Sequence, residues 1–213
     1  MTITKNEIKQ NIREFIQSQG NRVLPNDWYQ LVNQDAKQLS IDTGYPVDVI
    51  CAVIAVISPM QIWDKNWDTA QRIVHDVKQY GSLILSEVDD NGTRFFETQK
   101  YTGFKSNTLK AINMLITGNI NPYLKGNKVN NFYQNIRFPT DNNTFTLDVW
   151  MLRIAYNVLD MHNKDARLKL SDKRYAMFKQ AFIEVWYEDN YYKTMVPSSF
   201  QASLWVMVRG AKF

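Results

Sequence analysis

Lys128 and Asp148 are the two side chains of this 213-residue chain whose types and positions best suit chemistry on one sugar. Lys128 stands in the first turn of an apolar-periodic segment that begins after Gly126. There, the positive end of a helix dipole and the nearby Lys125 would favour the neutral amine. A neutral amine can attack an anomeric carbon and form a Schiff base. The alternative is a lysine that only contacts phosphate or solvent.

Asp148 lies in the otherwise apolar run "FTLDVWMLRIA". An acid in this run is either the N-cap of a helix or a functional carboxylate, and Thr144 or Thr146 could cap the same helix instead. An ionised carboxylate at a helix N-terminus can stabilise an oxocarbenium-like sugar while a base departs, or orient a water or amine nucleophile. Capping alone stays open as the alternative.

The turn "KGNK" precedes the segment that carries Lys128. Gly126 or Asn127 can take a positive φ there and turn the chain sharply, and the following helix begins with unpaired N–H groups. With Lys125 and Lys128 close by, this turn predicts a phosphate site. The alternative is an ordinary corner between two helices whose lysines are solvated.

Two stretches combine a glutamine with a tryptophan. Gln201 and Trp205 in "PSSFQASLWVMVRG" stand one helical turn apart and could line a pocket for a base. Such a helix more often packs through its aromatic side chain, and this stays the alternative. Gln61 and Trp63 lie at the corner that follows a buried segment, in "ISPMQIWDKNWDTAQRI". Core packing is the alternative for Trp63.

Helical periodicity dominates the chain and predicts an all-α fold. Apolar residues recur at spacings of three and four, and glycines or polar caps bound most of the periodic stretches. Only "LILSEV" and "TRFF" could be strands, and residues 87–103 are the least regular part. We expect roughly nine helices, within residues 4–20, 25–44, 46–58, 64–81, 104–118, 128–136, 144–159, 171–189 and 198–210.

Four short motifs follow one another in an order that is typical of one protein family. Along the chain they are Gln61 with Asp64, Lys65 and Asn66; Gly103 with Phe104, Lys105 and Asn107; Gly126 with Lys128 and Val129; and Asp148, 20 positions after Lys128. Over roughly residues 46–160, this pattern resembles the helix–hairpin–helix DNA glycosylase superfamily, and the last two helices look more like those of phage-type members. The chain departs from the family in three places. Leu124 stands where the first hairpin glycine is expected, Trp150 replaces a histidine, and no cysteine cluster follows.

The resemblance implies a two-lobed helical fold, with duplex DNA lying across a cleft. A middle lobe of about residues 50–136 would face a second lobe formed by residues 1–49 and 137–213. Asp148 would assist departure of a flipped, damaged or modified base, and Lys128 would be the amine nucleophile of a glycosylase with lyase activity. The Gln61 position would be a wedge that fills the gap left by the flipped nucleotide. The predicted nucleic-acid contacts are Gln61, Lys65, Lys105, Lys125, Gly126 and Asn127, and the predicted base pocket is formed by Trp63, Gln201 and Trp205.

Two other functions remain open at this point. Phage genomes use glycosylase-like proteins to make modified bases, so the same fold could alter a flipped base without excising it. A protein of a different class, a non-catalytic module that binds DNA or another protein, would also account for the weak net charge and the missing hairpin glycine.

Composition and the N-terminal sequence limit the partners, cofactors and cellular compartment that we expect. The net charge of +4 and the isoelectric point near 9.0 permit a polyanionic partner without requiring one. The lone Cys51 and the separated His75 and His162 support no metal site, and we expect no cofactor. The N-terminus does not read as a signal peptide, and no apolar run reaches the ~18 residues of a membrane span. We therefore expect an intracellular protein, in the host cytoplasm if it is viral.

Overall fold

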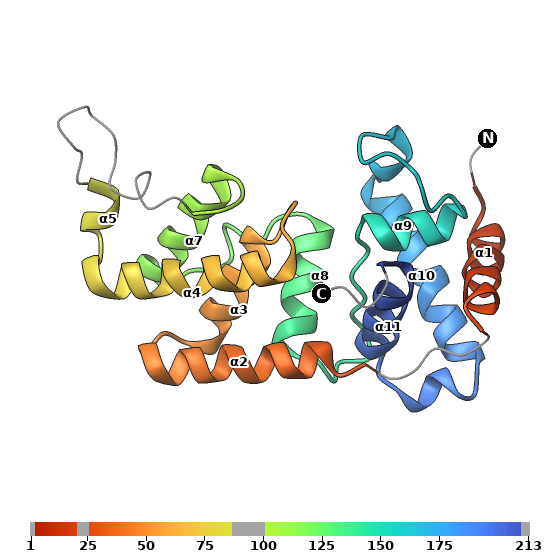
Figure 1. The fold of residues 1–213 in the computed structure, drawn as a ribbon, viewed down its shortest axis with the longest axis horizontal. Coiled ribbons are helices and arrows are strands. Elements are labelled where there is room, and N and C mark those ends of the chain that lie inside the picture. The colour runs from red at the N-terminus through yellow and green to blue at the C-terminus, as the bar shows by residue number, and fades with distance from the viewer. Residues whose placement is uncertain (1–2, 21–25, 87–100, 210–213) are drawn as a thin grey trace. The chain divides into compact units, whose positions relative to one another are not determined.

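The computed structural model describes residues 3–20, 26–86 and 101–209 of the chain, and helices dominate all three ranges (Figure 1). No described residue lies in a strand, so the predicted all-α fold is confirmed. The elements in chain order are α1 (Lys5–Ser18), α2 (Trp28–Thr43), α3 (Val47–Ile57), α4 (Trp63–Tyr80), α5 (Leu83–Ser86), α7 (Lys105–Thr117), α8 (Asn127–Arg137), α9 (Val149–Tyr156), η1 (Ala166–Leu168), α10 (Asp172–Glu188), η2 (Tyr192–Thr194) and α11 (Pro197–Arg209).

Two stretches of the sequence could have been strands, and the structure describes most of one of them and none of the other. Residues 83–86 of "LILSEV" form the short helix α5, with Ile84 buried. A strand there was the wrong alternative, since a lone strand would leave its buried backbone groups without a ladder partner. "TRFF" lies outside the described residues.

The helices of the described residues form two units. The first contains residues 1–31 and 134–212, and the second contains residues 32–133. The boundaries therefore fall inside α2, after Leu31, and inside α8, after Tyr133. The lobes expected from the sequence, about 50–136 and the two chain ends, stay a prediction.

The core of the first unit forms where α1 packs on α10 and α9, and where α11 packs on α9 and α10. The predicted stripe of α1, which contains Ile8, Ile12, Phe15 and Ile16, is buried in this core. Thr4 begins the helix with a capping box, because its side chain accepts from the Glu7 N–H and the Glu7 carboxylate accepts from the Thr4 N–H. Phe145, Phe178, Phe182 and Phe200 fill the interior.

The second unit is built around α3, which packs on α4 and α7. Every residue from Val49 to Ile57 is buried, so the prediction of a helix buried on every side is confirmed. A helix surrounded by other helices needs apolar side chains all round, and β-branched residues are accepted because packing outweighs their weaker helix propensity.

Ion pairs fasten α1 to α10 in the first unit. Lys5 and Lys9 donate to Glu184, and Lys9 and Arg13 donate to Glu188. The hydrogen bond from Lys5, followed by the one from Lys9, lowers the pKa of Glu184 from 4.5 to about 2. The bond from Lys9 also lowers the pKa of Glu188. A carboxylate with a lower pKa in the folded state stabilises that state above its unfolded-state pKa, and the stabilisation is lost as pH falls toward the folded-state pKa.

Glu184→Gln tests this contact through the pH dependence of thermal unfolding. We expect the variant to lower Tm at pH 7 by about 2–4 °C, because partly exposed pairs contribute at most about 1 kcal/mol. The difference from wild type should shrink between pH 4.5 and about 2, as Glu184 of the wild type becomes protonated. Glu14→Gln, at a carboxylate of α1 that only accepts from Gln10, is the control. A difference that stayed constant over this pH range would contradict the assignment.

Candidate functional site

Asp148 is the N-cap of α9, and both of its carboxylate oxygens have partners. Oδ1 accepts from the backbone N–H groups of Trp150 at 2.9 Å and Met151 at 3.0 Å. Oδ2 accepts from the indole Nε1–H of Trp205 at 3.1 Å. The alternative that Thr144 or Thr146 caps this helix is wrong, because the extended backbone of Asp148 occupies the cap position and both threonines are buried before it.

The position of Asp148 depends on the buried, non-helical residues 144–147 that precede it. A buried backbone outside regular structure must find partners for its polar groups elsewhere. The Leu147 N–H donates to the Tyr175 hydroxyl at 3.1 Å, and the Asn135 amide donates to Thr146 Oγ1 at 3.0 Å. Phe145 stacks on Phe182 with ring centroids 5.0 Å apart. These contacts fix the chain so that the half-buried carboxylate of Asp148 lies at the start of α9.

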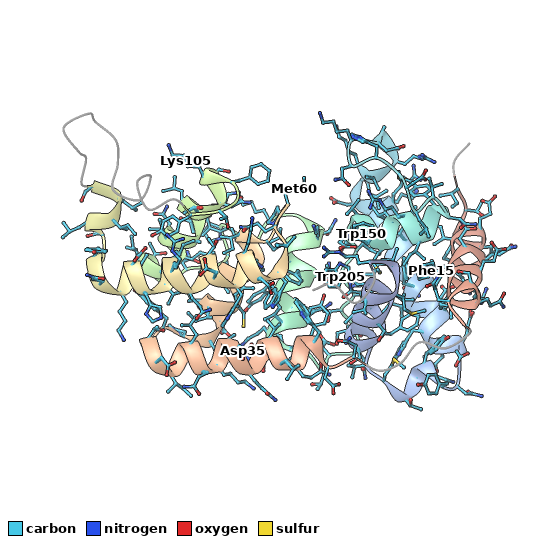
Figure 2. All side chains as sticks on the ribbon, in the orientation of Figure 1. Phe15, Asp35, Met60, Lys105, Trp150 and Trp205 are labelled. Carbon is cyan, nitrogen blue, oxygen red and sulfur yellow. The ribbon has the colours of Figure 1, made fainter. Side chains whose placement is uncertain are left out.

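The Trp205 indole contacts this carboxylate, and arginine side chains lie against Trp205 and the neighbouring Trp150 within the first unit. The Arg209 guanidinium carbon lies 4.5 Å from the ring centroid of Trp205 and 5.7 Å from that of Trp150. Arg153, which is buried, lies 4.2 Å from the Trp150 ring centroid. Trp28 approaches Trp205 at 6.3 Å. Figure 2 shows Trp150 and Trp205 as neighbours in this unit. We call Asp148, Trp150, Trp205 and Arg209 the tryptophan–carboxylate site.

Gln201 faces a different environment from Trp205, although both belong to α11. Gln201 is buried, and its Oε1 accepts from the Tyr29 hydroxyl at 2.7 Å. Burial raises the pKa of the Tyr29 phenol above its usual range, so this hydroxyl stays a donor. Of the three residues predicted to line a base pocket, Trp205 lies at the carboxylate, Gln201 lies in a buried polar contact, and Trp63 belongs to the second unit.

The predicted phosphate turn lies in the second unit. Gly126 takes the positive φ, 86°, and Asn127 begins α8, so Lys128 stands in its first turn as predicted. Lys125, Gly126 and Lys128 are exposed. The first N–H groups of α8 have no carbonyl four residues earlier within the helix. Lys128 belongs to the second unit and Asp148 to the first.

Gln61 is held by a set of hydrogen bonds that we call the Gln61 clasp. Its Nε2 donates to the carbonyl oxygens of Ile57 at 2.9 Å and Thr102 at 3.2 Å. Its Oε1 accepts from Thr102 Oγ1 at 2.6 Å, and that hydroxyl also contacts Thr69 Oγ1 at 2.6 Å. The clasp joins the corner between α3 and α4 to the residues before α7. Gly103, with φ of 90°, leaves room for the Gln61 amide.

Exposed apolar side chains surround the Gln61 clasp. Met60, Ile62 and Phe104 are 77%, 47% and 52% exposed, and Met60 takes a positive φ of 66°, which is unusual for a side chain of its size. We call these three residues the apolar tip. Figure 2 places Met60 and Lys105 along the same upper edge of this unit. Of the other predicted contacts here, Lys65 and Lys105 are exposed, and Trp63 stacks on Trp67 at 6.1 Å.

Sequence reasoning missed Met60, Ile62 and the polar groups that hold residues 144–147. Asn135 and Tyr175 occupy ordinary positions of amphipathic helices, and Met60 belongs to no periodic pattern, so local spacing carried no signal for them. Among the described residues, no group of three or more His, Cys, Asp or Glu side chains is arranged to hold a metal ion. No described helix has the length and hydropathy that a membrane crossing requires.

One protein family matches almost the whole chain. The model of DUF7178, described as a family of unknown function, covers residues 2–212. The chain belongs to this family. A search of curated proteins and a search of solved structures each found no match. The features of this DUF7178 member that bear on its function are the tryptophan–carboxylate site, the Gln61 clasp and the turn at Gly126.

Gly103→Ala tests the Gln61 clasp. An added Cβ would lie 2.5 Å from Gln61 Nε2 and 3.1 Å from its Cδ. The amide would have to leave the clasp, so we expect a loss of about 2–4 kcal/mol in the free energy of unfolding. The matched control is Gly118→Ala, where φ is also positive and no atom lies within 4 Å. The control should lose only about 1 kcal/mol. Equal losses in urea unfolding would contradict the clasp.

Asp148→Ala and Asp148→Asn separate the structural role of Asp148 from any other role. Alanine removes the cap and the acceptor for Trp205, so we expect a loss of about 1–2 kcal/mol. Asparagine keeps an acceptor oxygen for the two backbone N–H groups and ranks with aspartate as a cap, but its NH2 group replaces Oδ2 and cannot accept from Trp205. We therefore expect a loss of about 1 kcal/mol, from the Trp205 hydrogen bond alone. Urea unfolding measures both variants. A loss for asparagine larger than that for alanine would contradict the capping role.

Proposed function

We propose that this protein is a DNA glycosylase that acts on a damaged or modified base flipped out of a duplex. The observation that carries the proposal is the carboxylate of Asp148, held by three N–H donors beside Trp150 and Trp205. Such a group suits a reaction in which positive charge develops on a sugar while its base departs. The proposal includes a two-lobed arrangement with the helix–hairpin–helix turn at Gly126.

The three donors favour an electrostatic role for Asp148. A carboxylate offers about four lone-pair directions, so three N–H donors leave about one for a substrate. The donors also hold the carboxylate in one orientation, and a preorganised negative charge suits stabilisation of an oxocarbenium ion. In the proposed reaction, Asp148 lies against the sugar and stabilises its positive charge as the bond to the base breaks.

In this proposal, a flipped base stacks on the parts of the Trp150 and Trp205 rings that Arg153 and Arg209 leave uncovered. Trp150 and Trp205 are partly exposed, and stacking on such rings contributes about 1–3 kcal/mol per base. Arg209, close to both rings, adds a positive charge for the neighbouring phosphate. Gln201 supports α11 from its buried side, through Tyr29, and does not contact the base in this proposal.

The apolar tip supports contact with a duplex. Proteins that open a base step often insert an apolar side chain into the stack. Because the Gln61 amide is occupied by the clasp, we assign the wedge at this corner to Met60. Lys65 and Lys105 flank the tip and would contact phosphates. In the same way, Lys125, Asn127 and the N–H groups after Gly126 would bind a phosphate at the start of α8.

Lys128 is the proposed nucleophile of an associated lyase activity. Its amine would attack C1′ of the sugar, and the base would leave with the electron pair of the glycosidic bond and take a proton from water. The nitrogen would then lose its proton to water as the C1′–O4′ bond breaks, so that O4′ becomes a protonated hydroxyl and an imine forms at C1′. The exposure of Lys128 in the first turn of α8 leaves its amine accessible to DNA.

Oligonucleotide duplexes with oxidised, alkylated, deaminated or hypermodified bases test the proposal. We expect release of one class of base, reduced about 10²–10³-fold by Asp148→Asn, and a borohydride-trapped adduct that Lys128→Gln removes. Asp35→Asn and Lys37→Gln, at exposed positions of α2, should change neither signal. Base release that survives Asp148→Asn would exclude the role proposed for Asp148, and no release of any base by the wild type would exclude the glycosylase. An adduct as strong with Lys128→Gln would exclude the lyase step.

A second candidate function is a non-catalytic DNA-binding module. The observation that favours it is the capping role of Asp148, which by itself accounts for a carboxylate at this position. This candidate predicts duplex binding that Asp148→Asn leaves unchanged and no release of any base. A new nucleoside found by mass spectrometry of the digested DNA would instead indicate base modification.

A further inference from the structure

The residues between α9 and α10 carry most of the excess positive charge of the chain. We call residues 162–174 the basic connector; it contains η1 and the first residues of α10. It has five lysine or arginine residues against two aspartates, a net charge of +3, whereas the whole chain has a net charge of +4. The proposed function assigns no role to this segment.

Two arginines of the basic connector converge on Tyr156, the last residue of α9. The Tyr156 hydroxyl donates to the Arg167 carbonyl oxygen at 3.3 Å and accepts from Arg174 Nη2 at 2.9 Å. The Arg167 guanidinium carbon lies 5.7 Å from the Tyr156 ring centroid. Arg174 Nε is buried and has no hydrogen-bond partner among the described residues. The two arginines therefore hold the connector against the end of α9.

The three lysines of the basic connector are exposed, and its lysines and arginines outnumber its two carboxylates, Asp165 and Asp172. Lys164, Lys169 and Lys173 form no ion pair with a carboxylate of the described part of the chain. Asp165 is already engaged by Arg167, whose side chain lowers the pKa of that carboxyl to about 2. Lysine charges gathered in this way repel one another, and a polyanion relieves that repulsion.

Arg153 links the basic connector to the tryptophan–carboxylate site. Its guanidinium lies over the Trp150 ring at 4.2 Å and donates to Asn163 Oδ1 at 3.0 Å and to the Met161 carbonyl oxygen. The connector therefore begins beside Trp150. It continues to Tyr156 at the far end of α9, an eight-residue helix that spans about 12 Å.

We propose that the basic connector binds the phosphates of the strand whose base is held at Trp150 and Trp205. One strand of a duplex advances about 3.4 Å per nucleotide, so the contacted phosphates lie within about four nucleotides of that base. The inference rests on the proposed function for the position of the base, and it assigns a second phosphate-binding surface, in the first unit. Its chemistry is that of exposed lysines with phosphate oxygens.

The experiment compares the salt dependence of binding in two triple variants. Lys164, Lys169 and Lys173 are replaced by glutamine together, and Lys37, Lys78 and Lys110, all exposed in the second unit, are replaced together as a charge-matched control. Fluorescence anisotropy measures binding to a duplex that contains one tetrahydrofuran abasic analogue. The measurement is repeated at NaCl concentrations from about 0.05 M to about 0.3 M. Thermal unfolding confirms that both variants are folded.

For the connector variant, we expect the slope of log K against log[salt] to fall in magnitude by about 2–3, because each lost phosphate contact removes about 0.9. Binding at about 0.1 M salt should weaken at least tenfold, and the control should keep the wild-type slope. Neutral methylphosphonates placed singly within about four nucleotides of the abasic analogue should weaken wild-type binding and leave the connector variant unchanged.

The outcomes separate this inference from the proposed function. Base release with a slope that the connector variant leaves unchanged would overturn the inference and keep the glycosylase. A reduced slope without any base release would support the surface and reject the glycosylase. Equal losses in the two triple variants would indicate a general charge effect and would overturn the inference, as would a wild-type protein that binds no DNA.

Discussion

The carboxylate of Asp148 joins two helices of the first unit, and much of the arrangement around it depends on this joint. Two backbone N–H groups at the start of α9 and the indole of Trp205 on α11 converge on its two oxygens. The joint can form only because residues 144–147 carry the chain through the core without regular structure. Asn135 and Tyr175 supply the polar partners that such a passage requires. One anion thus sets the start of α9 and orients Trp205, and Arg209 lies over that ring.

The same hydrogen bonds to Asp148 stabilise the fold and support the proposed chemistry. The N–H donors that cap α9 also hold negative charge at a defined point, and a preorganised charge is what stabilises a cationic sugar most efficiently. A helix cap is common in proteins, whereas a cap flanked by two partly exposed tryptophans and an arginine is a more specific arrangement. The neighbouring rings and cation, more than the cap, therefore favour a nucleic-acid substrate.

The second unit uses hydrogen bonds in a different way. The Gln61 clasp closes the corner between α3 and α4 against the residues before α7, so Met60 and Phe104 extend from a rigid support. Exposed apolar side chains lose little conformational entropy on binding when their backbone is already held.

The cationic side chains of the first unit fall into two groups that differ in their partners. Those of α1 are paired with α10, while the lysines of the basic connector face solvent. The second group is the surface proposed to bind phosphates.

The sequence by itself determined most helices of this protein and several local features. The helix expected over residues 144–159 extends only from Val149 to Tyr156, and α5 lies in a stretch that left a strand open. Periodicity marked the buried stripe of α1, an apolar run after Pro46 marked α3, and a glycine marked the turn at Gly126, because these signals arise between residues a few positions apart. Only the tertiary structure decided what Asp148, Gln61 and Gln201 contact. Their partners Trp205, Thr102 and Tyr29 lie 57, 41 and 172 positions away. A hydrogen bond across such separations depends on how helices pack, and no local spacing records it.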